Sequence, residues 1–293
     1  MSDLPKRPVV LDIDHSVGAL PGRLVLPLEH WQEALRFGCS LGTLRRFGAV
    51  LDELLPAHYG TVLMGSGDFH HLSWPLIARL PVDPPFQVVV LDNHPDNMRF
   101  PFGVHCGSWV RKVALLPQVS HVHVLGITSH DIGGGHAWEN YLTPLRRRKL
   151  SYWSIGVDTG WAHRLGLAHA FRGFDSPDAL VEAFIQFQHG QSLPGYLSID
   201  KDAFAPEVAQ TNWDQGRLLL PHALALIGSL QHGVIGSDIN GEVSHYLYRS
   251  WWKRRLSALD DQPAIDPAML AGWQAQQHAL NLRLLDAIAA KNG

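Results

Sequence analysis

Short runs of apolar, often β-branched residues alternate along this chain with longer stretches of helical periodicity. Such alternation is typical of βαβ units, in which helices cover both faces of a parallel sheet. The expected strands are Pro8 to Ile13, Thr61 to Met64, Gln87 to Leu91, His121 to Ile127, Tyr152 to Val157, Tyr196 to Ile199 and Gly233 to Ile235. The expected helices are Leu28 to Cys39, Leu44 to Leu55, Ser108 to Leu116, Asp178 to Gln188, Leu218 to Leu230 and an amphipathic C-terminal helix from Asp266 to Lys291. The pattern predicts a three-layer αβα fold around a doubly wound, mostly parallel sheet.

Composition narrows the class of protein. With 293 residues, 46% hydrophobic and 17% charged, the chain can bury one large core, and we expect a single domain over 1–293. The net charge of −3 provides no basic field for nucleic acid, and no apolar run is long enough to cross a membrane. Cys39 and Cys106 form neither a disulfide framework nor a zinc ribbon, which favours the reducing cytoplasm.

Acidic residues follow two of the expected strands. The segment after Leu91 reads Asp92-Asn93-His94-Pro95-Asp96, and the one after Ile199 reads Asp200-Lys201-Asp202. Ligand sites of open α/β sheets lie at these carboxyl ends of the strands. Residues two apart on an extended chain point to the same side, so the acids and His94 should converge.

Converging carboxylates repel one another unless cations neutralise them, and bound metal is the simplest explanation for two such clusters. Oxygen ligands with one or two imidazoles suit manganese better than a metal that prefers thiolates. A single Asp-x-Asp motif could equally be a solvated loop or a helix cap, and His94 alone could be a satisfied core histidine. The occurrence of two motifs together favours metal.

Four further motifs are ambiguous when taken singly. The small residues of the segment Gly65 to His71 either let a ligand or another strand end approach the backbone closely or form a turn with Asp68 as a helix N-cap. His105 is either a proton shuttle or a structural histidine. The segment Gly236 to Glu242 is expected after the last strand, and its acidic side chains could either contact a cationic substrate or cap a loop. The Asp12, Asp14 and His15 cluster could line the same site at the carboxyl edge of the sheet, although a loop with an Asp turn is favoured.

In order and content, these pieces resemble the arginase-like (ureohydrolase) superfamily of arginases, agmatinases and formiminoglutamases. The resemblance spans Thr61 to Glu242. Its specific elements are Asp92-Asn93-His94-Pro95-Asp96, similar to the family's Asp-Ala-His-x-Asp, and Ser198 to Pro206, similar to Ser-x-Asp-x-Asp-x-x-Asp-Pro. Gly65 to His71 resembles the family's Gly-Gly-Asp-His element, and His105-Cys106-Gly107 its His-Gly segment.

The resemblance implies a hydrolase that cleaves a C–N bond of a linear guanidino or amidino compound with a hydroxide bridging two divalent ions, expected to be Mn²⁺. Asp92 and Asp200 would bridge the ions, and His70 is the expected histidine of the first element, with His71 as the alternative. The implied metal ligands are His70, Asp92, His94, Asp96, Asp200 and Asp202. The implied catalytic residues are Asp96, His105 and Glu242. Asp96, or alternatively Asp202, would help orient or relay the proton. His105 would help protonate the departing amine, and Glu242 would bind a guanidinium.

Departures from the family pattern keep other functions open. Phe69 is inserted before the histidines, Ala205 replaces an acid, and Glu242 follows Asp238 by four residues where the family usually has three. The segment Thr211 to Gly216 replaces a Gly-Thr-rich loop, which indicates a rebuilt pocket. A metal-dependent amide hydrolase or deacetylase, and a non-catalytic binding protein, are therefore the alternatives.

Two surface features bear on partners. Arg99 could bind a substrate carboxylate or be an ordinary surface arginine. Trp251-Trp252 beside Lys253 is a candidate for the interface of a homo-oligomer.

Overall fold

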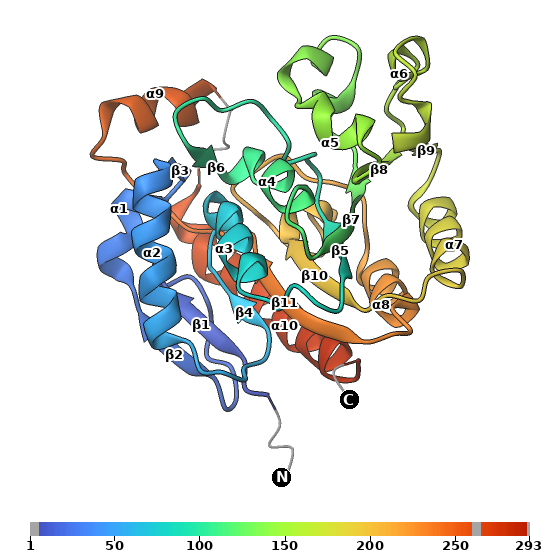
Figure 1. Cartoon of the computed structure of the whole chain (residues 1–293). Helices are drawn as coiled ribbons and strands as arrows, with labels where there is room; N and C mark the ends of the chain where they lie inside the picture. The colour runs from blue at the N-terminus through green and yellow to red at the C-terminus, as the bar shows by residue number, and fades with distance from the viewer. Residues whose placement is uncertain (1–5, 260–264, 292–293) are drawn as a thin grey trace.

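The computed structural model describes residues 6–259 and 265–291 and confirms the α/β fold (Figure 1). Nine strands form one sheet in the order β2-β1-β4-β11-β10-β5-β7-β8-β9, and every neighbouring pair is parallel. These strands are β1 (Val9–Asp12), β2 (Leu24–Pro27), β4 (Val62–Leu63), β5 (Phe86–Leu91), β7 (Val119–Ile127), β8 (Leu150–Ile155), β9 (Phe171–Phe174), β10 (Gly195–Asp200) and β11 (Val234–Asn240). A separate antiparallel pair joins β3 (Gly38–Cys39) to β6 (Val104–His105).

Helices cover both faces of the sheet and create two apolar cores. One core includes residues of α2 (Leu41–Leu54), α3 (Ser73–Ala78) and α4 (Val110–Ala114), and the other includes residues of α7 (Pro177–Gln188), α8 (Leu220–Ser229) and α10 (Pro267–Ala289). The remaining helices are α1 (Gln32–Leu35), α5 (Leu142–Arg146), α6 (Trp161–Arg164) and α9 (Trp251–Leu259). In β5, Val88 and Val90 face the first core whereas Val89 and Leu91 face the second, as alternation along a doubly covered strand requires.

Two predicted elements were wrong in extent. Leu28 to Cys39 is not one helix, because α1 has only four residues and ends before Phe37, whose φ of 66° is left-handed and whose N–H donates to the Asp68 carbonyl. The segment after Ile235 is not a loop, because β11 continues to Asn240 and pairs with β10. The edge strands β2 and β9 were not predicted.

The predicted C-terminal helix is present as α10 and packs on the body of the protein. Leu280, Leu284 and Ile288 are buried in the core shared with α8. Two polar residues of the same helix also point inward: Gln277 Oε1 accepts a hydrogen bond from the Val243 N–H at 2.7 Å, and Asn281 Nδ2 donates to Glu242 Oε1 at 2.7 Å. The helix therefore fixes the chain that follows β11.

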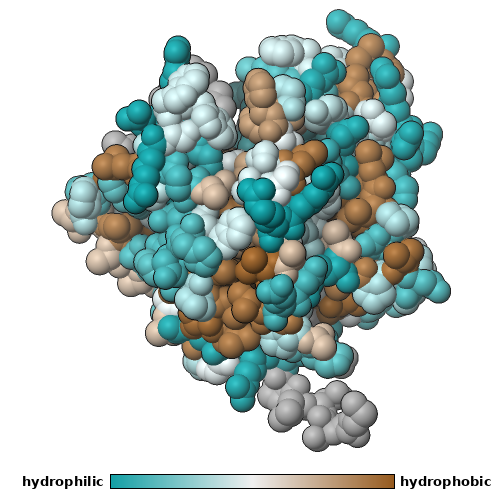
Figure 2. Space-filling view, turned by 60° about the vertical axis from the view of Figure 1, so that its left-hand side comes forward, coloured by the Kyte–Doolittle hydropathy of each residue, from teal (hydrophilic) through white to brown (hydrophobic). Residues whose placement is uncertain are grey.

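The surface is mainly hydrophilic in the view of Figure 2, where apolar residues gather chiefly in the lower half. Among residues 6–259 and 265–291, no helix is both long enough and apolar enough to span a membrane. At the start of α9, Trp251 is 67% exposed, but Lys253 is buried and donates to the carbonyls of Glu33 and Arg36. Lys253 thus stabilises the fold, and an oligomer interface at Trp251 stays a prediction.

Candidate metal centre

The two acidic motifs meet because their strands are neighbours in the sheet. Strand β5 ends at Leu91, which pairs with Ile199 of β10, so Asp92 and Asp200 leave the sheet side by side. The chain then turns sharply at Asp96, which has a φ of 46° and whose carbonyl accepts the Val110 N–H. Parallel pairing thus delivers the acids to one edge, as predicted.

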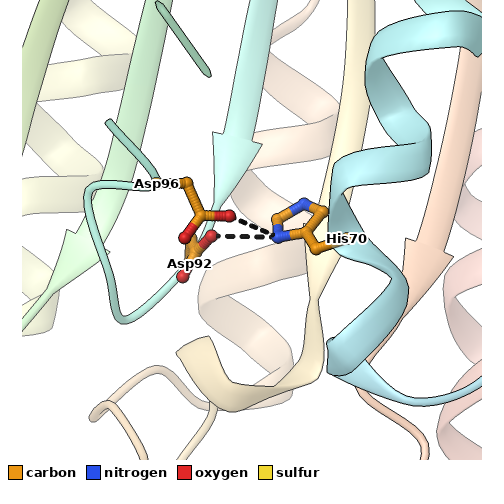
Figure 3. A group of neighbouring side chains, drawn as sticks. All are labelled: His70, Asp92 and Asp96. Atoms are coloured by element: carbon orange, nitrogen blue, oxygen red, sulfur yellow. Dashed lines mark ion pairs between the residues drawn. The ribbon is translucent and has the colours of Figure 1, made fainter. Parts of the chain in front are cut away.

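His70 lies at the centre of the first group of side chains. It comes from the 3₁₀ segment Gly67–Leu72, which follows β4, and it faces the carboxylates across a short gap (Figure 3). Its Nδ1 is 2.8 Å from Asp96 Oδ2, 3.2 Å from Asp92 Oδ2 and 3.4 Å from Asp200 Oδ2. All four side chains are buried, and His70, Asp92 and Asp96 are spaced closely enough to hold one metal ion.

A second group lies on the other side of Asp92. His94 Nδ1 is 2.9 Å from Asp202 Oδ2 and 3.6 Å from Asp92 Oδ1, and Asp92, His94 and Asp202 could hold a second ion. Asp92 belongs to both groups, which is the position expected of a bridging carboxylate. Asp200 Oδ2 lies beside His70 of the first group, and Asp200 Oδ1 accepts the N–H of Asp202 at 3.0 Å.

The electrostatics show how crowded these acids are. Desolvation and then the charge of Asp92 raise the pKa of Asp96 to about 7, and the same two causes raise the pKa of Asp202 to about 7. Desolvation and then Asp202 raise the pKa of Asp200 well above its ordinary value. Desolvation opposes charge on Asp92 as well, but His70 and His94 lower its pKa below the ordinary value. The cluster is therefore short of positive charge.

Hydrogen bonds behind the two imidazoles fix their orientation. His70 Nε2 lies 3.0 Å from Ser198 Oγ, which donates to Asp238 Oδ1 at 2.7 Å, and Asp238 also receives the Tyr196 hydroxyl at 2.6 Å. His94 Nε2 lies 2.8 Å from Asp214 Oδ1. Such outer partners orient ligand histidines in metal sites. Asp238 thus supports the cluster rather than facing a substrate.

Two histidines had uncertain roles in the sequence. His71 points away from the acids: its Nε2 is 3.9 Å from Cys39 Sγ, and burial lowers its pKa. His105 lines the cavity, and burial lowers its pKa to about 4, which keeps the ring neutral. Because the Gly107 N–H donates to His105 Nδ1, the neutral ring carries its proton on Nε2.

A cavity of about 560 Å³ opens over the carboxylates. Its lining includes every predicted metal ligand and also residues that the sequence did not single out for chemistry. These additional residues are Phe37, Met98, Phe100, Ser129, His130, Asp131, His136, Glu139, Trp213 and Asp214. Most lie on loops or in short 3₁₀ helices, where no periodicity marks them. Trp213 and Asp214 belong to the 211–216 segment, which the resemblance had indicated as part of a rebuilt pocket.

Several predicted contacts lie outside this cavity. Glu242 is buried and accepts hydrogen bonds from Lys201 Nζ and from Asn281 Nδ2, and it is not among the cavity residues. Arg99 also lies outside and donates to the Asn140 carbonyl at 3.4 Å. The structure therefore brings neither residue to the acids.

The Asp12, Asp14 and His15 cluster does not line the cavity either. His15 pairs with Asp12 at 3.0 Å, while Asp14 pairs at 2.8 Å with Arg36, which is buried and also binds Asp68 at 2.7 Å. This network lies beneath Phe37 and anchors one wall of the cavity.

Solved structures with the same architecture cover nearly the whole chain. An agmatine ureohydrolase of Thermoplasma volcanium superposes with a TM-score of 0.55 at 14% identity, covering 97% of this chain and 90% of its own. A proclavaminate amidino hydrolase from Streptomyces clavuligerus gives 0.55 at 18%, covering 98% and 93%. A formiminoglutamase of Trypanosoma cruzi, solved with Mn²⁺, gives 0.50 at 14%, covering 85% and 72%.

The chain has the arginase-like ureohydrolase fold. No known family profile matches the sequence. A protein of Thermotoga maritima described as uncharacterized is 28% identical over 193 residues, which are 66% of this chain and 62% of that protein. Within the arginase-like fold, the two His/Asp groups form at the carboxyl edge of the sheet, and each could hold a metal ion.

Proposed function

We propose that this protein is a hydrolase that uses two divalent metal ions to cleave a C–N bond of a small linear molecule. The observation that carries the proposal is the pair of His/Asp groups that share Asp92 at the base of the cavity. The arginase-like fold and the manganese of the structurally similar formiminoglutamase support the same chemistry.

The residues present fit such ions. None of the residues that the structure describes donates a hydrogen bond to the buried Asp92 Oδ2, which lies 3.2 Å from His70 Nδ1, and a buried carboxylate oxygen of this kind is a suitable ligand for a cation. The donors are carboxylate oxygens and imidazole nitrogens, a set that suits manganese. Ions held by His70, Asp92, His94, Asp96, Asp200 and Asp202 would lower the pKa of bound water and make hydroxide available near neutral pH.

The protein's own groups would then position the reactants and move protons. Asp96 and Asp202, which line the cavity, could orient a water molecule and accept its proton. His105 carries an Nε2 proton at the cavity wall and could donate a hydrogen bond to the departing nitrogen. Water would add to the carbon, the carboxylate that accepted its proton would pass that proton to the nitrogen, and the C–N bond would break as the nitrogen leaves as an amine.

Two scissile groups are compatible with this arrangement. The names of the structurally similar proteins favour a guanidino or amidino group, as the resemblance implied. A specific observation favours an amide instead: Glu242, the acid expected to grip a guanidinium, is occupied by Lys201 and Asn281. Described lining residues include Asp131 and Glu139 but no lysine or arginine, which favours a substrate without a carboxylate.

Metal content tests the proposal. Wild type loaded with Mn²⁺ and dialysed should retain two ions per chain by plasma mass spectrometry, and Asp92→Asn should lose both because Asp92 serves both groups. Asp131→Asn is the matched control, since Asp131 lines the same cavity outside the two groups. A wild type that retains no manganese, zinc, nickel or iron would reject the hydrolase in favour of a non-catalytic binding protein. If the ions bind, released urea, ammonia or amine should be screened with guanidino, amidino and amide compounds.

A further inference from the structure

The segment 211–216, which replaces the family's Gly-Thr-rich loop, supplies two side chains to the cavity. Asp214 Oδ1 lies 2.8 Å from His94 Nε2, and Trp213 lines the cavity with its ring inclined by 71° to the His94 ring at a centroid distance of 6.1 Å. The segment is fixed at its base by two hydrogen bonds between Asn212 and Ser244, each 2.8 Å long. The position of Trp213 is therefore built into the fold.

The N–H edge of the Trp213 indole and the Asp200 carboxylate both lie beside Gly67. A Cβ atom placed on Gly67 would lie 3.1 Å from Asp200 Oδ2, 3.2 Å from Trp213 Cδ1 and 3.4 Å from Trp213 Nε1. The N–H edge and the Asp200 carboxylate thus flank the same small space. The ring is stacked on Phe37, with centroids 6.4 Å apart and planes inclined by 17°, so Phe37 lies over one face of the indole.

Trp213 Nε1 is buried and has no hydrogen-bond partner among the residues that the structure describes. An unpaired buried donor is costly, and a ligand that supplies an acceptor removes that cost. A guanidinium presents only donors, and the edge of an aromatic ring is its positive region, so a cation is disfavoured at this position. An amide carbonyl presents an acceptor.

We propose that Trp213 selects the scissile group: its indole N–H binds the carbonyl oxygen of an amide substrate and disfavours a guanidinium. The inference rests on the proposed metal hydrolase and chooses between its two scissile groups. Trp213 is then a specificity-determining residue contributed by the 211–216 segment.

Binding of two probes with the same butyl chain tests the assignment. Calorimetry of the Mn²⁺-loaded protein should show that N-butylacetamide binds more tightly than butylguanidine. Trp213→Phe keeps a ring but removes the donor, and it should weaken amide binding by about threefold to tenfold while leaving butylguanidine unchanged or tighter. Trp31→Phe is the matched control, because Trp31 Nε1 is also buried without a partner but lies outside the cavity lining.

A spectroscopic measurement needs no variant. In protein labelled with ¹⁵N-tryptophan and loaded with Zn²⁺, one of the ten indole signals should shift with N-butylacetamide and not with butylguanidine, and Mn²⁺ should broaden that same signal. Equal effects of Trp213→Phe on both probes, or a shift caused by butylguanidine alone, would overturn the role of Trp213 and leave the metal hydrolase standing. Failure of the wild type to hold metal would overturn both.

Discussion

Replacing Glu242 with glutamine keeps the size of the side chain and removes the charge that faces Lys201 in the interior. Lys201 is 0% exposed and Glu242 is 2% exposed, and the Lys201 ammonium donates to Glu242 Oε1. Desolvation already lowers the pKa of Lys201, and only Glu242 and then Asp200 favour its charged form. Glu242→Gln therefore leaves a buried cation without its main counter-charge.

The expected loss of stability is large. Breaking a buried ion pair by removing one partner costs about 3–5 kcal/mol. For a chain of this size, roughly 2–4 °C per kcal/mol corresponds to a Tm about 6–20 °C lower. The loss should shrink as pH rises toward 10, because a lysine whose pKa is lower in the folded state binds fewer protons there than in the unfolded chain, and stability then increases with pH.

Thermal melts at pH 7 and pH 9.5 measure this directly. Glu207→Gln, on an exposed glutamate, is the matched control and should change stability by less than about 0.5 kcal/mol. Lys201→Met combined with Glu242→Gln should recover most of the loss, since no unpaired charge is left and Asn281 keeps an acceptor. A Glu242→Gln protein that is as stable as wild type but has a raised KM would refute the structural role and indicate that Glu242 binds the substrate.

Three further predictions concern the support of the site and the pH dependence of folding. Ser198→Ala removes the partner of His70 Nε2 and should weaken metal binding by about tenfold to a hundredfold in chelator competition. Arg36→Met removes the buried guanidinium that pairs with Asp14 and Asp68 and should cost about 3–5 kcal/mol in urea unfolding. Burial holds the pKa of His123 well below its ordinary value, so the folded state keeps it neutral while the unfolded chain binds a proton below about pH 6.5. The contribution of His123 to stability should therefore fall as pH drops from 7 to 5, and His123→Asn should lose less stability over that range than the wild type does.

The sheet could be predicted because its central strands are apolar on both faces. Strand β5 has six buried residues, and its run of valines leaves little choice but a covered parallel strand. Edge strands β2 and β9 lack this signal, since each is only partly buried. The helix expected over Leu28 to Cys39 failed for a different reason, because the left-handed Phe37 interrupts a pattern that periodicity alone reads as continuous.

The acids were predictable for the same physical reason as the strands. Asp92 and Asp200 lie at the ends of neighbouring buried strands, and the hydrogen-bond ladder between these strands fixes where they meet. Asp238 was assigned to a loop because an acid seldom occurs inside a buried strand. Its carboxylate is satisfied there by Tyr196, Ser198 and Ser73, partners that are distant in sequence or on another strand.

In this fold, hydrogen bonds between strands place the proposed metal ligands, whereas loops place the side chains that would recognise a substrate. The ladder keeps Asp92 and Asp200 together whatever the loops contain, whereas one rebuilt segment brings Trp213 and Asp214 to the cavity, and one ion pair withdraws Glu242 from it. Under the proposed function, the acids therefore indicate how a bond would be cleaved but not which bond. A search for the substrate should accordingly hold the alkyl chain constant and vary the scissile group, since the changes in this chain lie around that group.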